Sequence, residues 1–75
     1  MLTLKDFLFI SWYVQPIIVI DYHNGILHES ANIEKIKESA LYSGINHDLK
    51  ADNELMNRYV YSYGAIDDHM IIEVR

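Results

Sequence analysis

An aspartate and two histidines lie close together in the stretch VIDYHNGILHES, residues 19–30. Carboxylate and imidazole are ligands that Zn²⁺ and other divalent ions accept in proteins. An imidazole that a carboxylate orients can also serve as a general base. The Asn24 and Gly25 pair favours a type I′ hairpin turn, because both central positions of that turn need a positive φ. In such a hairpin Asp21 lies opposite His28, and Asp21, His23 and His28 project from one face.

The alternative interpretation of these three side chains is a solvent-facing charge pair. Strands that lie on a single surface seldom bring side chains together into a closed site, and Ser30 is the one nucleophile nearby. An exposed cross-strand pair stabilises a sheet by only about a few tenths of a kcal/mol. We therefore expect no metal and no cofactor. A small metal-dependent hydrolase that uses Asp21, His23 and His28 is the least favoured function.

A second metal-like group, Asp67, Asp68 and His69, lies near the end of the sequence. Acidic residues at a hairpin tip are explained by the tolerance of Asp for turn geometry. The sequence therefore favours a turn here over a ligand set. The two aspartates are better candidates for contacts to a basic partner than for metal ligands. The expected partner-binding residues are Asp48, Asp52, Glu54, Asp67 and Asp68.

The composition limits the classes of function. The sequence has 75 residues, a formal net charge of −5 and no cysteine. This length predicts a single domain over residues 1–75, and thiol chemistry is excluded. Acidic excess disfavours phosphate binding, so we expect no direct contact with nucleic acid. The apolar run over residues 7–20 is shorter than the roughly 20 residues that span a bilayer. We therefore expect no membrane contact and a cytoplasmic protein.

The first predicted element is a helix that begins after Thr3, a favourable N-cap, and ends before Pro16. One apolar stripe at helical spacing can cover a sheet. A second stripe contains Phe9 and Tyr13 and needs a cover of its own. We expect a homodimer whose interface contains Phe9, Trp12 and Tyr13.

The middle of the sequence predicts a hairpin and a helix. Residues 17–20 are rich in β-branched side chains and favour a strand. The Asn24 and Gly25 turn then returns a second strand, and Ile18 and Ile20 face the core. Residues 33–43 follow as a helix, which Asn32 caps and Gly44 terminates.

The end of the sequence, RYVYSYGAIDDHMIIEVR, predicts a second hairpin with Asp67 and Asp68 as its turn. In this register Ala65 opposes Met70. The three alternating tyrosines are expected on the core face, and the opposed pairs are Tyr63 with Ile72 and Tyr61 with Val74.

Together these elements predict an α+β domain in the order α-β-β-α-β-β. The expected sheet has four antiparallel strands in two hairpins, with the helices mainly on one face. The other face keeps apolar side chains such as Ile17 and Val19. This surplus is a second reason to expect a partner protein.

Three segments, TLKDFL, VIDYHNG and RYVYSYGAIDDHMIIEV, resemble a loose group of small proteins that phages, prophages and mobile elements of Gram-positive bacteria encode. The resemblance implies an origin in a mobile element and a location in the host bacterial cytoplasm. It carries no catalytic residues over to this sequence. Small acidic proteins from such elements are similar to inhibitors, such as anti-CRISPR proteins, that block a host defence nuclease.

We therefore expect a non-enzymatic protein-binding module that inhibits a host defence protein through its acidic and apolar surface. The partner would be a nucleic-acid-binding effector with a basic surface. The alternative is a small phage structural, assembly or accessory protein that has no inhibitory target.

Overall fold

The sheet has four strands and is mixed. The structure is a computed structural model that describes residues 2–10, 14–29, 31–49 and 53–75. Its strands are β1 (Pro16–Asp21), β2 (Tyr42–Ile45), β3 (Val60–Ile66) and β4 (His69–Val74). They lie in the order β2-β1-β4-β3, and β1 is antiparallel to β2 but parallel to β4. The predicted α+β class is confirmed, whereas the antiparallel sheet of two hairpins is wrong.

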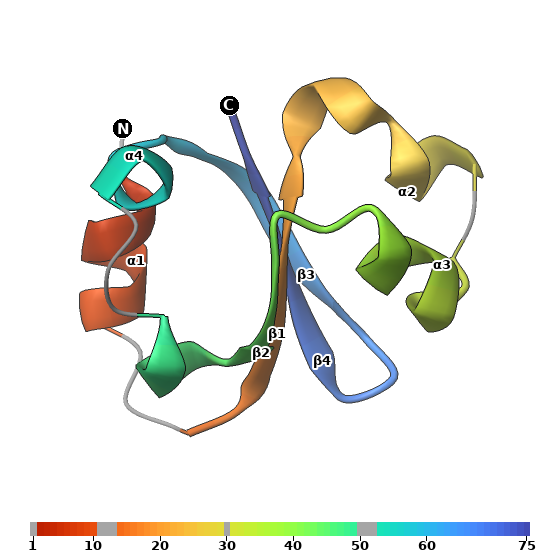
Figure 1. Ribbon diagram of the computed structural model, residues 1–75, viewed down its shortest axis with the longest axis horizontal. Coiled ribbons are helices and arrows are strands. Elements are labelled where there is room, and N and C mark those ends of the chain that lie inside the picture. The colour runs from red at the N-terminus through yellow and green to blue at the C-terminus, as the bar shows by residue number, and fades with distance from the viewer. Residues whose placement is uncertain (1, 11–13, 30, 50–52) are drawn as a thin grey trace.

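Short helices cover both faces of the sheet (Figure 1). They are α1 (Leu4–Phe9), α2 (Ile26–Glu29), α3 (Ile33–Glu38) and α4 (Asn53–Met56), with 3₁₀ turns η1 (Tyr22–Asn24) and η2 (Asn46–Asp48). Figure 1 shows α1 and α4 on one face and α2 and α3 on the other, so the expectation of helices mainly on one face is wrong. Within the described residues, no helix has the length and apolar character needed to cross a bilayer.

The start of α1 is the one that the sequence predicts. The Thr3 hydroxyl accepts a hydrogen bond from the Asp6 backbone N–H at 3.2 Å, and Asp6 lies in the first turn, near the positive end of the helix. The helix ends at Phe9 with Ile10 as its C-cap, well before Pro16. Residues 11–13 lie outside the described part of the chain.

The first predicted hairpin does not form, because the Asp21 side chain turns the chain into η1. Its Oδ1 accepts the His23 backbone N–H at 2.8 Å, a local bond that competes with strand pairing. Gly25, at φ 71°, caps η1 as a single left-handed residue, whereas a type I′ turn needs two. His28 therefore belongs to α2 and not to a strand opposite Asp21.

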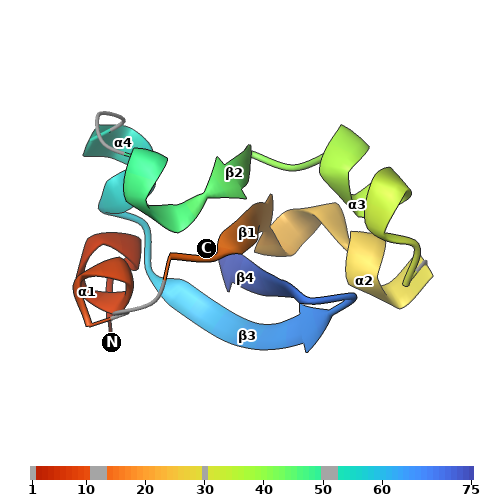
Figure 2. The same ribbon diagram turned by 90° about the horizontal axis from the view of Figure 1, so that it is seen from below.

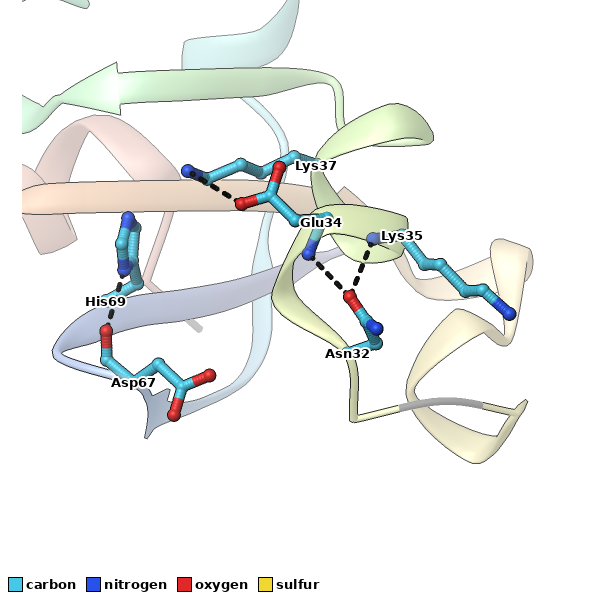
Figure 3. Close-up of polar contacts among 6 residues, drawn as sticks. All are labelled: Asn32, Glu34, Lys35, Lys37, Asp67 and His69. Atoms are coloured by element: carbon cyan, nitrogen blue, oxygen red, sulfur yellow. Dashed lines mark hydrogen bonds and ion pairs between the residues drawn. The ribbon is translucent and has the colours of Figure 1, made fainter.

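The second predicted helix is shorter than expected. The Asn32 Oδ1 caps α3 by accepting the backbone N–H groups of Glu34 at 2.9 Å and Lys35 at 3.3 Å, as Figure 3 shows. The helix ends at Glu38, and β2 follows where the sequence predicts a last helical turn. Gly44 lies within β2, opposite Ile17, instead of terminating a helix. Pairing with β2 satisfies the backbone of β1 along one edge.

The C-terminal hairpin has the predicted turn and most of the predicted register. Asp67 and Asp68 both have positive φ, 48° and 63°, as a type I′ turn requires. Ala65 opposes Met70, and Tyr63 opposes Ile72. A register shift between Val60 and Ser62 places Val60, and not Tyr61, opposite Val74.

The central strand β1 is buried on both faces. Its residues 17–20 are all 0–1 % exposed. Ile17 and Val19 pack beneath α1 and α4, and Ile18 and Ile20 pack beneath α2 and α3. The predicted solvent-facing positions of Ile17 and Val19 are therefore wrong. A continuous apolar run is typical of a strand that has a parallel neighbour and cover on both faces.

The tyrosine row is exposed, which contradicts its predicted place in the core. Tyr59, Tyr61 and Tyr63 are 49 %, 48 % and 67 % exposed. They belong to or precede β3, which is an outer strand of the sheet. The core beneath α1 instead contains Ile72 of β4.

Candidate functional site

Both carboxylate oxygens of Asp21 have partners within the chain. Oδ1 accepts the His23 backbone N–H at 2.8 Å, and Oδ2 lies 3.1 Å from Nη2 of Arg58. The His23 hydrogen bond and then the Arg58 guanidinium lower the pKa of this carboxyl. The His23 side chain is exposed. Among the described residues, no group of three His, Cys, Asp or Glu side chains is placed to hold a metal ion.

Arg58 ties together the ends of two parallel strands. Besides its ion pair with Asp21, its Nε donates to the Arg75 carbonyl and its Nη2 donates to the Val74 carbonyl, both at 3.4 Å. The ends of β1 and β4 are thereby fixed to a residue that lies two positions before the start of β3 at Val60. We interpret this arrangement as structural, because the carboxylate of Asp21 neutralises the cation.

A small aromatic group lies beside this ion pair. The rings of Tyr22 and Tyr61 have centroids 4.1 Å apart, and the Arg75 guanidinium carbon lies 5.7 Å from each centroid. A hydrogen bond with Tyr22 raises the pKa of the Tyr61 hydroxyl. No pattern in the sequence indicates this contact, because η1 replaces the predicted strand at Tyr22.

The group of Asp67, Asp68 and His69 forms the tip of the C-terminal hairpin. His69 Nδ1 lies 2.9 Å from the Asp67 carbonyl oxygen, and Figure 3 shows the Asp67 carboxylate directed away from the His69 ring. Both aspartates are exposed. Their charges are therefore available to a partner, while the backbone explains why Asp occupies these positions.

An apolar groove of about 510 Å³ lies between α1, η2 and α4. Its apolar lining includes Leu8, Leu49 and Met56, which are half-buried, and Phe9, which is 87 % exposed. Asp6 contributes a carboxylate to the same groove. Of the three predicted interface residues, Phe9 lies at this groove. Trp12 and Tyr13 lie outside the described residues.

The expected acidic residues do not gather at one site. Asp48 in η2 and Glu54 in α4 are exposed and belong to the elements that border the groove. Asp67 lies at the tip of the β3–β4 hairpin (Figure 3), and Asp68 follows it in the same turn, so this pair is not on the elements that border the groove. Asp52 lies outside the described residues. Neither Asp48 nor Glu54 lines the groove itself, whose charged lining is Lys5 and Asp6, and Glu54 lines a second, smaller pocket with Leu41, Leu55 and Arg58.

The chain was compared with protein-family models, with curated proteins and with solved structures, and none of the three comparisons gives a match. Two surface features of this chain therefore remain as candidate binding surfaces. They are the groove beside Phe9 and the outer strand β3 with its exposed tyrosines.

Proposed function

We propose that this chain is a non-enzymatic protein-binding module that docks on a basic or mixed surface of a host protein. The observation that carries the proposal is the groove beside α1, where the exposed ring of Phe9 adjoins apolar side chains. Exposed aromatic side chains at the centre of an interface supply much of its binding energy. Asp6 lines the groove beside Lys5, and the exposed acidic side chains Asp48 and Glu54 lie on the bordering elements η2 and α4. These three carboxylates fit a partner that carries Lys or Arg around an apolar contact.

Charge supports this choice of partner. A net charge of −5 on 75 residues attracts a basic surface over distances near the Debye length, about 8 Å at physiological salt. Such attraction raises the rate of association, and apolar contact then slows dissociation. Binding should therefore weaken as ionic strength rises.

The specific form that we propose is inhibition of a defence nuclease by a protein from a mobile element. Proteins that bind nucleic acid present Lys and Arg to the phosphate backbone. An acidic protein with an apolar anchor competes for that surface without any chemical step. The sequence resemblance to phage and mobile-element proteins supports this form.

A cleavage assay tests the proposal. Purified CRISPR nucleases and other defence nucleases from Gram-positive bacteria would be assayed for DNA cleavage over a range of concentrations of this protein. We expect inhibition of at least one effector. The Asp48→Lys/Glu54→Lys variant and the Phe9→Ser variant should each raise the half-inhibitory concentration at least about tenfold.

The matched control is Glu29→Lys/Glu38→Lys, which changes the net charge equally on the side of the sheet that α2 and α3 cover. This control should inhibit like the wild type. Absence of binding and inhibition across the panel would contradict the proposal, as would equal losses in the control and in the groove variants. Specific capture of a virion protein from infected cells would instead support the assembly function.

A further inference from the structure

The outer edge of β3 is open along most of its length. Figure 2 shows β3 as the last strand on its side of the sheet, with β4 between it and β1. Near its start the edge is covered, because the Val60 N–H donates to the Leu2 carbonyl and the Leu4 N–H donates to the Arg58 carbonyl, both at 2.8 Å. Beyond Tyr61, no described element pairs with this edge.

The register identifies the backbone groups that face outward. In a two-residue hairpin, Ile66 and His69 form a hydrogen-bonded pair, and such pairs alternate along the ladder. Gly64 is therefore hydrogen-bonded to β4, whereas Tyr63 and Ala65 form non-hydrogen-bonded pairs with their partners. The N–H and C=O groups of Tyr63 and Ala65 consequently point away from β4, toward the open edge.

Nothing in the part of the chain that the structure describes explains the glycine in the middle of this strand. Gly64 does not have a positive φ, and a Cβ placed on it would meet no atom of the described residues within 4 Å. A glycine within a strand destabilises the fold by about 0.5–1 kcal/mol relative to alanine. Glycine in a strand often marks a position that another backbone approaches closely.

The open segment also lacks the features that usually prevent strand pairing. Although the chain carries a net charge of −5, β3 (Val60–Ile66) contains no charged residue and no proline. Its Tyr63 ring is 67 % exposed, and Ala65 beside it is exposed as well. A second copy of this strand would therefore meet no like charge.

We propose that two copies of this chain pair through their β3 edges, antiparallel about a two-fold axis at Gly64. Two four-stranded sheets then become one continuous sheet. In this register Tyr63 of each copy lies opposite Ala65 of the other, and each such pair exchanges two main-chain hydrogen bonds. The bulky ring faces the small side chain, and the two Gly64 residues approach to about 4.5 Å between Cα atoms.

The self-complementary register is what favours a second copy over another extended chain. An isologous interface uses the same patch on both subunits, and Tyr63, Gly64 and Ala65 supply both halves of every contact. The contact is small compared with the roughly 800 Å² per partner of a standard interface, so we expect a dissociation constant in the micromolar range. This edge is distinct from the groove beside Phe9, and either proposal can fail without the other.

Sedimentation velocity from about 1 to 500 μM tests the pairing. We expect wild type to shift from the 8.8 kDa monomer to twice that mass. Ala65→Pro removes an outward N–H and leaves the hairpin ladder intact, and Tyr63→Lys places a charge at the interface. Each should weaken the dimer at least tenfold. Tyr59→Lys is the matched control, because residues 2–4 already cover the edge there, and it should dimerise like wild type.

Engineered cysteines test the register and remain informative if Ala65→Pro fails to fold. The chain has no cysteine, so every disulfide in a single-cysteine variant joins two copies. Gly64→Cys should cross-link readily under mild oxidation, because the two positions face each other across the axis. Ala65→Cys should cross-link far more slowly, since its Cα atoms lie beyond about 7 Å.

Four results would overturn the proposal. The first three are a wild type that stays monomeric at 500 μM, a dimer that Tyr63→Lys and Ala65→Pro leave unchanged, and cross-linking of Ala65→Cys in preference to Gly64→Cys. The fourth is a monomer that binds an extended peptide along β3, because the peptide and not a second copy would then occupy the edge.

Discussion

Two adjacent isoleucines of β1 provide a stringent test of the fold. Ile17 packs beneath α1 and Ile18 packs beneath α3, and both side chains are 0 % exposed. Truncation of a fully buried isoleucine to alanine destabilises a protein by about 2–5 kcal/mol, through lost apolar burial and the cavity left behind. A domain of this length is expected to have a free energy of unfolding of about 4–11 kcal/mol. Ile17→Ala and Ile18→Ala should each remove a large part of it.

Urea denaturation, monitored by circular dichroism at one fixed low protein concentration, measures the free energy of unfolding of each variant. Val14→Ala is the control, because Val14 is 67 % exposed, and it should change stability by less than about 0.5 kcal/mol. If the sheet were covered on one face only, Ile18→Ala would be strongly destabilising and Ile17→Ala would resemble the control. That result would refute the two-sided core.

Two further perturbations test the turn and the ion pair. Replacing Asp67 and Asp68 by Asn and Gly should stabilise the fold by about 0.5–1 kcal/mol, because both positions have positive φ, and an unchanged denaturation midpoint would contradict the type I′ assignment. Arg58→Met should destabilise the protein by about 1–2 kcal/mol at pH 7. The folded-state pKa of Asp21 lies below 3.8, so the ion pair stabilises the fold above that pH, and the deficit of the variant should shrink as pH falls through the folded pKa. A deficit that stays constant down to pH 2 would exclude the ion pair as its source.

Local chemistry in the sequence was sufficient to predict several parts of this fold. The Thr3 and Asn32 caps, the strand of residues 17–20 and the turn at Asp67 and Asp68 all follow from side-chain and backbone preferences within a few residues. These features depend on short-range geometry, so the sequence predicts them well.

The errors arise where tertiary contacts decide between local alternatives. Asn24 and Gly25 fit a hairpin turn, but the Asp21 side chain bonds the His23 N–H and the chain enters η1. The parallel pairing of β1 with β4 joins segments about 50 residues apart, and no local pattern reports it. Because that pairing places β1 at the centre of the sheet, it also reverses the expected exposure of Ile17 and of the tyrosines.

Prediction of the candidate surface was limited in the same way. The exposure of Phe9 follows from the second apolar stripe of the first helix, which the sequence shows. The groove beside it depends on η2 and α4, which are packed against α1 from distant parts of the chain. Arg58 and Arg75 meet Asp21 and Tyr22 only because β1 and β4 are neighbours.

The central claim about the sheet is that its β3 edge pairs with the same edge of a second copy, and amide hydrogen exchange along β3 tests it most directly. The Gly64 and Ile66 N–H groups face β4 and serve as internal references that should be protected at every concentration. We expect protection of the Tyr63 and Ala65 N–H groups to rise steeply as protein concentration increases from about 1 to 500 μM. Fast exchange at Tyr63 and Ala65 throughout that range, with Gly64 still protected, would contradict the claim for this edge.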